Sequence, residues 1–543
     1  MGEAFNLLSP DQQNTIFTWI EEGPDVTDIE NPEEAQRYVR SWRMRRLFWL
    51  NGHLSEPWID RCRKLVEEFG EPTESAKFSA FAQEFIGSRS PISAEELKAL
   101  PVKNIVQRLK SWEPSPGFMM PSREGLAERL ATAVTEDPRR FVADIDSFRG
   151  VHPTYVRFLI QALQNVLATG QVDWIRILPF LKWIVDQGEE FKGKAVKDRL
   201  DEDPDWRGAR RTLAYLLEGG FTQTAVYTPF ELRAAAWEIL AVLLRDSDPT
   251  PEDEARQIRT HEDASHMSIN RTRGIAMHTV VRYALWVEKH LDEPDPITLR
   301  KMPEVQAAFE NGLDEKLEPS LTVRSVYGRW FAWIQHLDSK WAREHVAQIF
   351  PKDDANLAMW TVAWGSYVCF SAAFSDSLQT LIPEYRLAIE RLGGVLPSET
   401  KSQNIEARLA EHLMGFFWHG NLELDGSDGL IGLFWKKAPV ELRRKALQAL
   451  CRWLHTKEAI GLEILKRLRG LWEWRVQTVS EMQSDPKELS SFSWWFSSGQ
   501  FDDEWAIDQL EQLQKTENGN RSEFRFHATA GANGSCYASA RGA

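Results

Sequence analysis

Cysteine is scarce in this sequence, which contains four: Cys62, Cys369, Cys451 and Cys536. No two of them form a CxxC pair or lie close enough to suggest a disulfide framework or a thiolate zinc site. We therefore expect no metal centre built on cysteine. A reducing, cytoplasmic environment fits this composition best.

Long apolar runs and a leader peptide are also lacking. The N-terminus, MGEAFNLLSPDQQ, has neither the basic start nor the apolar core of a signal peptide. The longest apolar run, Ala234–Leu244, is bracketed by Arg233 and Arg245 and is too short to span a bilayer. The sequence predicts a buried helix there and no membrane partner.

Positive charge is in the minority. Lys and Arg total 65 against 80 for Asp and Glu, which gives a net charge of -15. The field of the whole molecule would repel a phosphate backbone, so we expect no nucleic-acid partner.

Alternating strand patterns and hairpin turns are nearly absent, and Gly and Pro separate segments of helical length. Ser9, Pro10 and Gln12 match the start of a helix with a capping box, which Gly23 ends. A second helix is predicted to begin at Thr228. Its apolar residues have helical spacing: Leu232, Ala236, Ile239, Leu240 and Leu243. We predict an all-α protein.

Weak internal repeats point to a particular all-α architecture. The phrase TPFELRAAAWEIL at 228–240 returns as APVELRRKALQAL at 438–450. Such echoes are typical of stacked helical hairpins. We predict a solenoid of degenerate hairpins, similar to TPR or HEAT repeats, over residues 1–515. Sub-boundaries are expected near the polar stretches 190–205, 246–268 and 393–404, and a Gly/Ala/Ser-rich, disordered tail over 516–543.

Two segments imitate ligand-binding loops. Residues 188–195 match GxxxxGK, but Ala195 lacks the hydroxyl that ligates magnesium in a phosphate-binding loop. Asp201, Asp203 and Asp205 imitate a calcium loop without its glycine and its final glutamate. We interpret the first as a charged loop and the second as an acidic turn that caps a helix, and we expect no cofactor.

Histidine pairs give no metal site either. His261 and His266 are five residues apart and point in different directions on a helix. His412 and His419 share a helix face but lack a third ligand. Packed or partly exposed histidines are the preferred interpretation.

One helix, over residues 268–290, is predicted to have an apolar and a basic side. The basic side consists of Arg271, His278, Arg282 and Lys289. It could contact an anionic partner, or it could be a solvated face paired with neighbouring carboxylates. The same choice applies near the N-terminus to Arg37, Arg40, Arg43, Arg45 and Arg46.

Aromatic residues gather at 325–334 and 492–505, among the residue types that dominate interface hot spots. From these clusters we select exposed partner-binding candidates: Arg329, Trp330, Trp333, Trp494 and Trp495. The alternative is that the rings fill grooves between successive hairpins.

Four phrases carry a family resemblance: SINRTRGIAMHTVVRYALWVEKHL, DPDWRGARRTLAYLLEGG, EPSLTVRSVYGRWFAWI and SFSWWFSSGQFDDEWA. With them, residues 1 to about 515 resemble the C-terminal helical region of large bacterial proteins that carry a STAND-type NTPase, some of which serve in antiviral defence. The resemblance implies a sensor that recognises an invader-derived protein and releases the NTPase to oligomerise. Because this sequence has no intact nucleotide-binding loop, the resemblance implies a truncated fragment or a separately supplied part.

We therefore hypothesise a non-catalytic helical array that binds a protein partner. A structural scaffold for cellular protein complexes is the alternative. A second alternative is an enzyme whose site is assembled from residues scattered along the chain. A fragment of a longer array would expose an apolar end, so we expect self-association through the solenoid ends.

Overall fold

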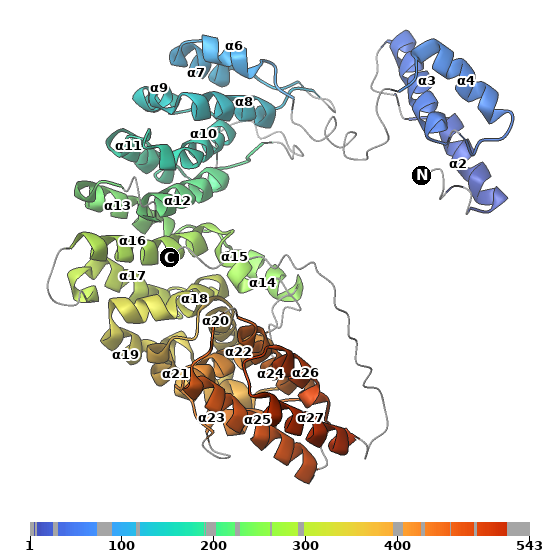
Figure 1. Ribbon diagram of the computed structural model, residues 1–543. Helices are drawn as coiled ribbons and strands as arrows, with labels where there is room; N and C mark the ends of the chain where they lie inside the picture. Colours follow the sequence, from blue (N-terminus) through green and yellow to red (C-terminus); the bar gives the residue numbers. More distant parts are fainter. Residues whose placement is uncertain are drawn as a thin grey trace. The chain divides into compact units, whose positions relative to one another are not determined.

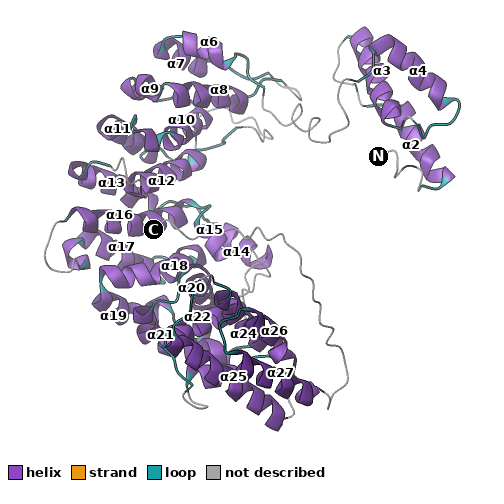
Figure 2. Cartoon of the chain, viewed as in Figure 1, coloured by secondary structure: helices purple, strands orange, loops and turns teal. Residues whose placement is uncertain are grey.

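The structure is a computed structural model, which describes residues 5, 8–24, 26, 31–50, 52–72, 89–115, 120–188, 191, 202–222, 228–260, 263–291, 298–394, 405–424, 429–456, 458–482 and 486–517. These residues form α-helices joined by turns, loops and short 3₁₀ segments, with no β-strand among them (Figure 2). The predicted all-α class is confirmed. Beyond residue 517 the predicted tail lies outside the described residues, so its disorder stays a prediction.

The chain divides into two compact units, Met1–Leu243 and Leu244–Ala543. The expected sub-boundaries at 190–205 and 393–404 lie largely outside the described residues. The helices of the first unit are α2 (Pro10–Glu22), α3 (Pro32–Trp49), α4 (Trp58–Phe69), α6 (Ala94–Ala99), α7 (Val102–Ser111), α8 (Arg123–Glu136), α9 (Pro138–Ala143), α10 (Pro153–Asn165), α11 (Trp174–Val185), α12 (Arg207–Thr222) and α13 (Arg233–Leu243).

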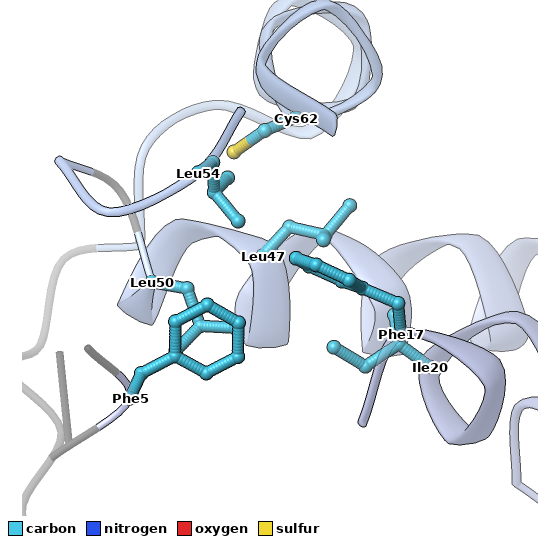
Figure 3. Close-up of a cluster of buried hydrophobic side chains, with 7 residues drawn as sticks. All are labelled: Phe5, Phe17, Ile20, Leu47, Leu50, Leu54 and Cys62. Atoms are coloured by element: carbon cyan, nitrogen blue, oxygen red, sulfur yellow. The ribbon is translucent and has the colours of Figure 1, made fainter. Parts of the chain in front are cut away.

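Helices α2, α3 and α4 share a hydrophobic core, which Figure 3 shows. Its buried residues are Phe5, Phe17, Ile20, Leu47, Leu50, Leu54 and Cys62. The predicted capping box is confirmed, because Ser9 and Gln12 exchange side-chain and backbone hydrogen bonds. Gly23 ends α2 at a φ of 79°, a conformation that favours glycine.

The remaining helices of the first unit pack in sequential order (Figure 1). Helix α10 packs against α8 and α12, and α11 packs against α9 and α13. The helix expected after Thr228 exists, but it begins as a 3₁₀ turn, Phe230–Leu232, followed by α13. This turn follows Pro229 and no side chain caps it, so Thr228 is not its cap; the hydroxyl of Thr228 donates to the carbonyl oxygen of Gly220 at 3.3 Å.

Within the second unit, helices that follow one another in the sequence also pack together (Figure 1). One row of neighbouring helices is α16, α18, α20, α22 and α24, and α19, α21 and α23 pack in succession beside it. The helices of this unit are α14 (Pro251–Thr260), α15 (Ala264–Ser268), α16 (Thr272–His290), α17 (Pro303–Leu313), α18 (Leu321–Leu337), α19 (Ser339–Ile349), α20 (Leu357–Phe370), α21 (Ser375–Glu390), α22 (Ile405–Trp418), α23 (Leu430–Lys437), α24 (Val440–Leu454), α25 (Leu462–Met482), α26 (Phe492–Ser497) and α27 (Asp503–Glu517).

Helices α18 and α20 approach each other closely at Gly328. A methyl group added at Gly328 would lie 1.8 Å from the carbonyl oxygen of Ala363. Only glycine therefore allows the two backbones to pack at this separation.

The stretch 246–268, expected to be a polar connection, contains α14 and α15. Hydrogen bonds also join the start of this stretch to α16. The buried carboxylate of Asp248 accepts hydrogen bonds from the backbone N–H and the hydroxyl of Thr272, at 2.9 and 3.0 Å. Asp248 thus caps the first turn of α16 from the preceding segment.

Buried and partly buried arginines satisfy the carbonyl ends of several helices. Arg324 on α18 is 1% exposed, and its guanidinium donates to the carbonyl oxygens of Leu313 and Gln348, at the ends of α17 and α19. Arg467 on α25 donates to Trp418 at the end of α22, and Arg43 on α3 donates to Ile20 near the end of α2. These contacts pair a positive charge with the negative end of a helix.

We predict that Arg324→Met lowers the free energy of unfolding by about 3 kcal/mol, because methionine fills much of the space but leaves two helix-end carbonyls without a donor. Urea unfolding followed by far-UV circular dichroism measures this change. Arg343→Met, at an exposed position on α19, is the matched control and should change the value by less than about 0.5 kcal/mol. Equal effects of the two substitutions would contradict the capping role.

Candidate functional site

His278, expected on a basic outer face, lies in the interior at 3% exposure. That expectation is wrong, because α15, α17 and α18 pack around α16 and cover more than its apolar stripe. Trp330 on α18 is also buried, and its Nε1 donates to Nδ1 of His278 at 2.6 Å. A helix within a row has neighbours on several sides, so more of its surface is buried than the apolar spacing of its own sequence predicts.

The Nε2 atom of His278 lies 2.9 Å from the hydroxyl oxygen of Ser268, like a nucleophile beside its base. Because the indole N–H of Trp330 can only donate, Nδ1 of His278 must accept, and Nε2 carries the proton. Nε2 therefore donates to Ser268, whose own hydroxyl donates to the carbonyl oxygen of Ser265 at 2.7 Å. Burial, with Arg329 and Arg282 nearby, lowers the pKa of His278 to about 3. In this arrangement His278 cannot take a proton from Ser268.

The other predicted basic residues have varied surroundings. Arg271 forms an ion pair with Asp248 at 3.1 Å, as the carboxylate-paired interpretation expected. The guanidinium of Arg282 lies 4.5 Å from the ring centre of Trp330, and that of Arg329 lies 4.5 Å from the ring centre of Phe370. Lys289 is exposed at the end of α16.

The predicted aromatic candidates separate into two groups. Trp333 and Trp494 are exposed, Trp494 at 63%. Trp330 and Trp495 are buried, so the expectation that they are exposed is wrong. Trp495 packs on Trp472 and Phe501, and its Nε1 donates to the carbonyl oxygen of Leu447 at 3.2 Å. These two rings fill space between helices, as the alternative interpretation held.

Two clefts lie along the row formed by α20, α22, α24 and α26. The first has a volume of about 460 Å³, and its lining includes Cys369, Arg408, His412 and Trp453. The second has a volume of about 530 Å³, and its lining includes Lys445, Cys451, Arg452 and Trp494. Glu411 on α22 lines both clefts. We call the two clefts together the Glu411 groove.

Charge in the Glu411 groove centres on one carboxylate. Glu411 accepts a hydrogen bond from Arg408 at 2.6 Å and another from Arg452. Burial alone would raise the pKa of Glu411, but these two guanidinium groups lower it below its ordinary value. Glu411 is therefore ionised at neutral pH. The lining has three cationic side chains, Arg408, Lys445 and Arg452, against this one carboxylate.

Exposed aromatic rings lie at two positions along this row. Trp494 lines the second cleft. Phe370, at the end of α20, is 45% exposed, but it is not part of the lining of the first cleft, and its ring lies against Arg329 of α18. The rings that line the first cleft are those of Trp418 and Trp453. Among the groove residues, sequence reasoning selected Trp494 but missed Arg408, Glu411 and Arg452. A periodic signal could have found them, because contacts between neighbouring helices of the row join residues 41 or 42 positions apart.

His412, in the wall of the first cleft, is a packed histidine, as expected. Its Nε2 lies 3.0 Å from the carbonyl oxygen of Ser371, which can only accept, so Nε2 carries the proton. Its Nδ1 then accepts from the hydroxyl of Tyr385 at 2.8 Å. Burial lowers the pKa of His412 to about 4, and the imidazole is neutral at pH 7.

The segments that imitate ligand loops are only partly visible. Residues 188–195 lie largely outside the described residues, as do Asp201 and His261, whereas His266 is exposed on α15. Asp203 forms an ion pair with Arg157 at 2.7 Å. Asp205 accepts from the backbone N–H of Arg207 at 2.9 Å, which confirms an acidic turn that caps the following helix, α12.

Neither a metal-binding cluster nor a membrane-spanning helix occurs in the described part of the chain. No group of three or more His, Cys, Asp or Glu residues there is placed to hold a metal ion. None of the described helices combines the length and apolar character needed to cross a bilayer. Comparisons with protein-family models, with curated proteins and with solved structures each found no match to this chain.

We predict that acid weakens the second unit through His412. The unfolded imidazole titrates near 6.5 and the folded one near 4, so between these values the unfolded chain binds a proton that the folded chain does not. Stability should therefore fall as the pH drops from 6.5 toward 4, by about 2 kcal/mol at pH 5 for this group. Urea unfolding at a series of pH values measures the slope.

His412→Gln should show a shallower loss of stability in this pH window, because glutamine does not titrate. His419→Gln, at an exposed position on the same segment, is the control and should keep the parental slope. Parallel curves for His412→Gln and the parent chain would contradict the predicted pKa shift.

Proposed function

We propose that this chain is a non-catalytic helical-repeat array that binds another protein through the Glu411 groove. The observation that carries this proposal is a groove that extends over neighbouring helices and has tryptophan rings in both clefts, the exposed Trp494 in the second and Trp453 in the first. Tryptophan and arginine are the residue types on which interface energy concentrates. A groove built on packed helices offers them with little rearrangement on binding.

A solenoid of degenerate, HEAT-like hairpins is the architecture we propose for the array. Sequential packing supports it, as do the contacts at separations of 41 and 42 residues in the second unit. HEAT and armadillo repeats have periods of about 40–47 residues. In such arrays each repeat contacts its neighbours and adds to a continuous binding surface.

A non-catalytic role is supported by the chemistry of the buried groups. His278 and His412 are neutral, and both ring nitrogens of each are used in hydrogen bonds within the fold. Burial raises the pKa of Cys369 and Cys451 to about 11, which keeps these thiols protonated at neutral pH. A protonated thiol is a poor nucleophile.

The resemblance to the helical region of STAND-type NTPase proteins gives the proposal its specific form. In that form the chain is the target-recognition part of a bacterial defence or signalling NTPase, and its partner is an invader-derived protein. A partner from the uninfected cell would instead favour a scaffold for cellular complexes.

A photo-crosslinking amino acid placed at position 494 or 453, one in each cleft, tests the groove directly in cells. We expect the same protein to be captured from positions 494 and 453, in uninfected or infected cells, but not from position 19, where the native Trp19 is 61% exposed on α2. Capture from position 19 alone would contradict the proposal.

With the captured protein purified, Trp494→Ala should weaken its affinity at least about tenfold, or about 1.4 kcal/mol, because the substitution removes a large ring from the interface. Titration calorimetry measures the change. Trp19→Ala, which removes an equally exposed tryptophan elsewhere, should leave the affinity unchanged. An unchanged affinity in Trp494→Ala would show that binding occurs at another surface.

A further inference from the structure

The cationic side chains of the Glu411 groove have more positive charge than the groove itself neutralises. Arg408 and Arg452 share the single carboxylate of Glu411. Lys445 is exposed, and no ion pair joins it to another described residue. Arg408 and Arg452 also keep more than half of their side-chain surface exposed. Further hydrogen-bond donors are therefore free to meet an acceptor in the groove.

This local excess is opposite in sign to the charge of the chain. Acidic residues outnumber basic ones 80 to 65 overall, whereas cations outnumber the carboxylate in the groove lining. At physiological salt, charges act over about 8 Å, so a bound group is influenced mainly by the groove and less by the rest of the molecule.

We infer that the groove binds an acidic, extended segment of the partner protein, with carboxylates on Lys445 and Arg452 and an apolar side chain on Trp494. This inference rests on the proposed function and adds the chemistry of the partner. Arginine pairs with carboxylates in a bidentate geometry, and a carboxylate of the partner would share Arg452 with Glu411. The exposed indole of Trp494 supplies an apolar surface in the same cleft as both cations.

A polypeptide is favoured over a nucleic acid as the source of negative charge. A phosphate backbone extends beyond the groove and would meet a chain of net charge -15. A short acidic segment places its charge only where the cations are. An apolar side chain beside the carboxylates also matches Trp494, whereas a repeating phosphate backbone offers no such group.

The test uses the full chain and three fluorescent probes: a peptide of alternating Glu and Leu, its Lys and Leu counterpart, and a single-stranded DNA oligonucleotide. Binding is read by fluorescence anisotropy at about 50 mM and about 300 mM salt. We expect the acidic peptide to bind at least tenfold more tightly than the basic one at low salt. Its affinity should fall several-fold at high salt.

The double variant Lys445→Glu, Arg452→Gln should weaken the acidic peptide at least tenfold. The matched control is Lys340→Glu, Arg343→Gln, which makes the same charge change at exposed positions of α19. The control should bind like the parent chain. Thermal melting and circular dichroism establish whether both variants are folded. If the double variant is not folded, the single variant Lys445→Glu replaces it and should show a smaller loss of affinity for the acidic peptide.

Three results would overturn the inference: no binding of the acidic peptide, equal losses in the variant and its control, or tighter binding of the oligonucleotide. Binding of the captured partner to these variants distinguishes failure of this inference from failure of the proposed function. A partner whose binding depends on Trp494 but not on Lys445 and Arg452 leaves the proposed function standing and removes the acidic segment. A partner whose binding depends neither on Trp494 nor on Lys445 and Arg452 contradicts both the proposed function and the acidic segment.

Discussion

The last four carbonyl groups of an α-helix have no partner within that helix, and a chain of short, packed helices buries many such ends. Here, buried and partly buried arginines from neighbouring helices donate to several of them. Arg324 on α18 joins the ends of α17 and α19, and Arg467 on α25 joins the end of α22. These contacts fix one helix against the next in a way that apolar packing, which has no direction, cannot.

The same constraint decides which arginines remain for binding. Arg324 is buried and bonded to helix ends, and Arg271 is paired with Asp248, so neither is available to a partner. Arg408 and Arg452, in contrast, share one carboxylate at the surface. Small residues beside them keep the first cleft open, because the lining at 372, 373 and 415 consists of alanine and glycine. The Glu411 groove thus combines space, exposed cations and aromatic rings at one place in the second unit.

Local features of the fold could be predicted from the sequence. The Ser9 capping box depends on residues three apart, and the apolar spacing of α13 lies within one helix. Burial could not be predicted in the same way: Trp495 is covered by residues distant in sequence, and Trp330 of α18 lies against His278 of α16. The groove escaped notice because its residues contact one another at separations of about 40 positions, beyond the range of helical periodicity.

The central claim is that a protein partner lies in the Glu411 groove. Hydrogen–deuterium exchange of the full chain, with and without the partner captured at position 494, measures this for every helix at once. We predict slower exchange on binding in α22, α24 and α26, which supply most of the groove lining, and little change in α2, α3 and α4. Slower exchange confined to other helices, with these three unchanged, would contradict the claim.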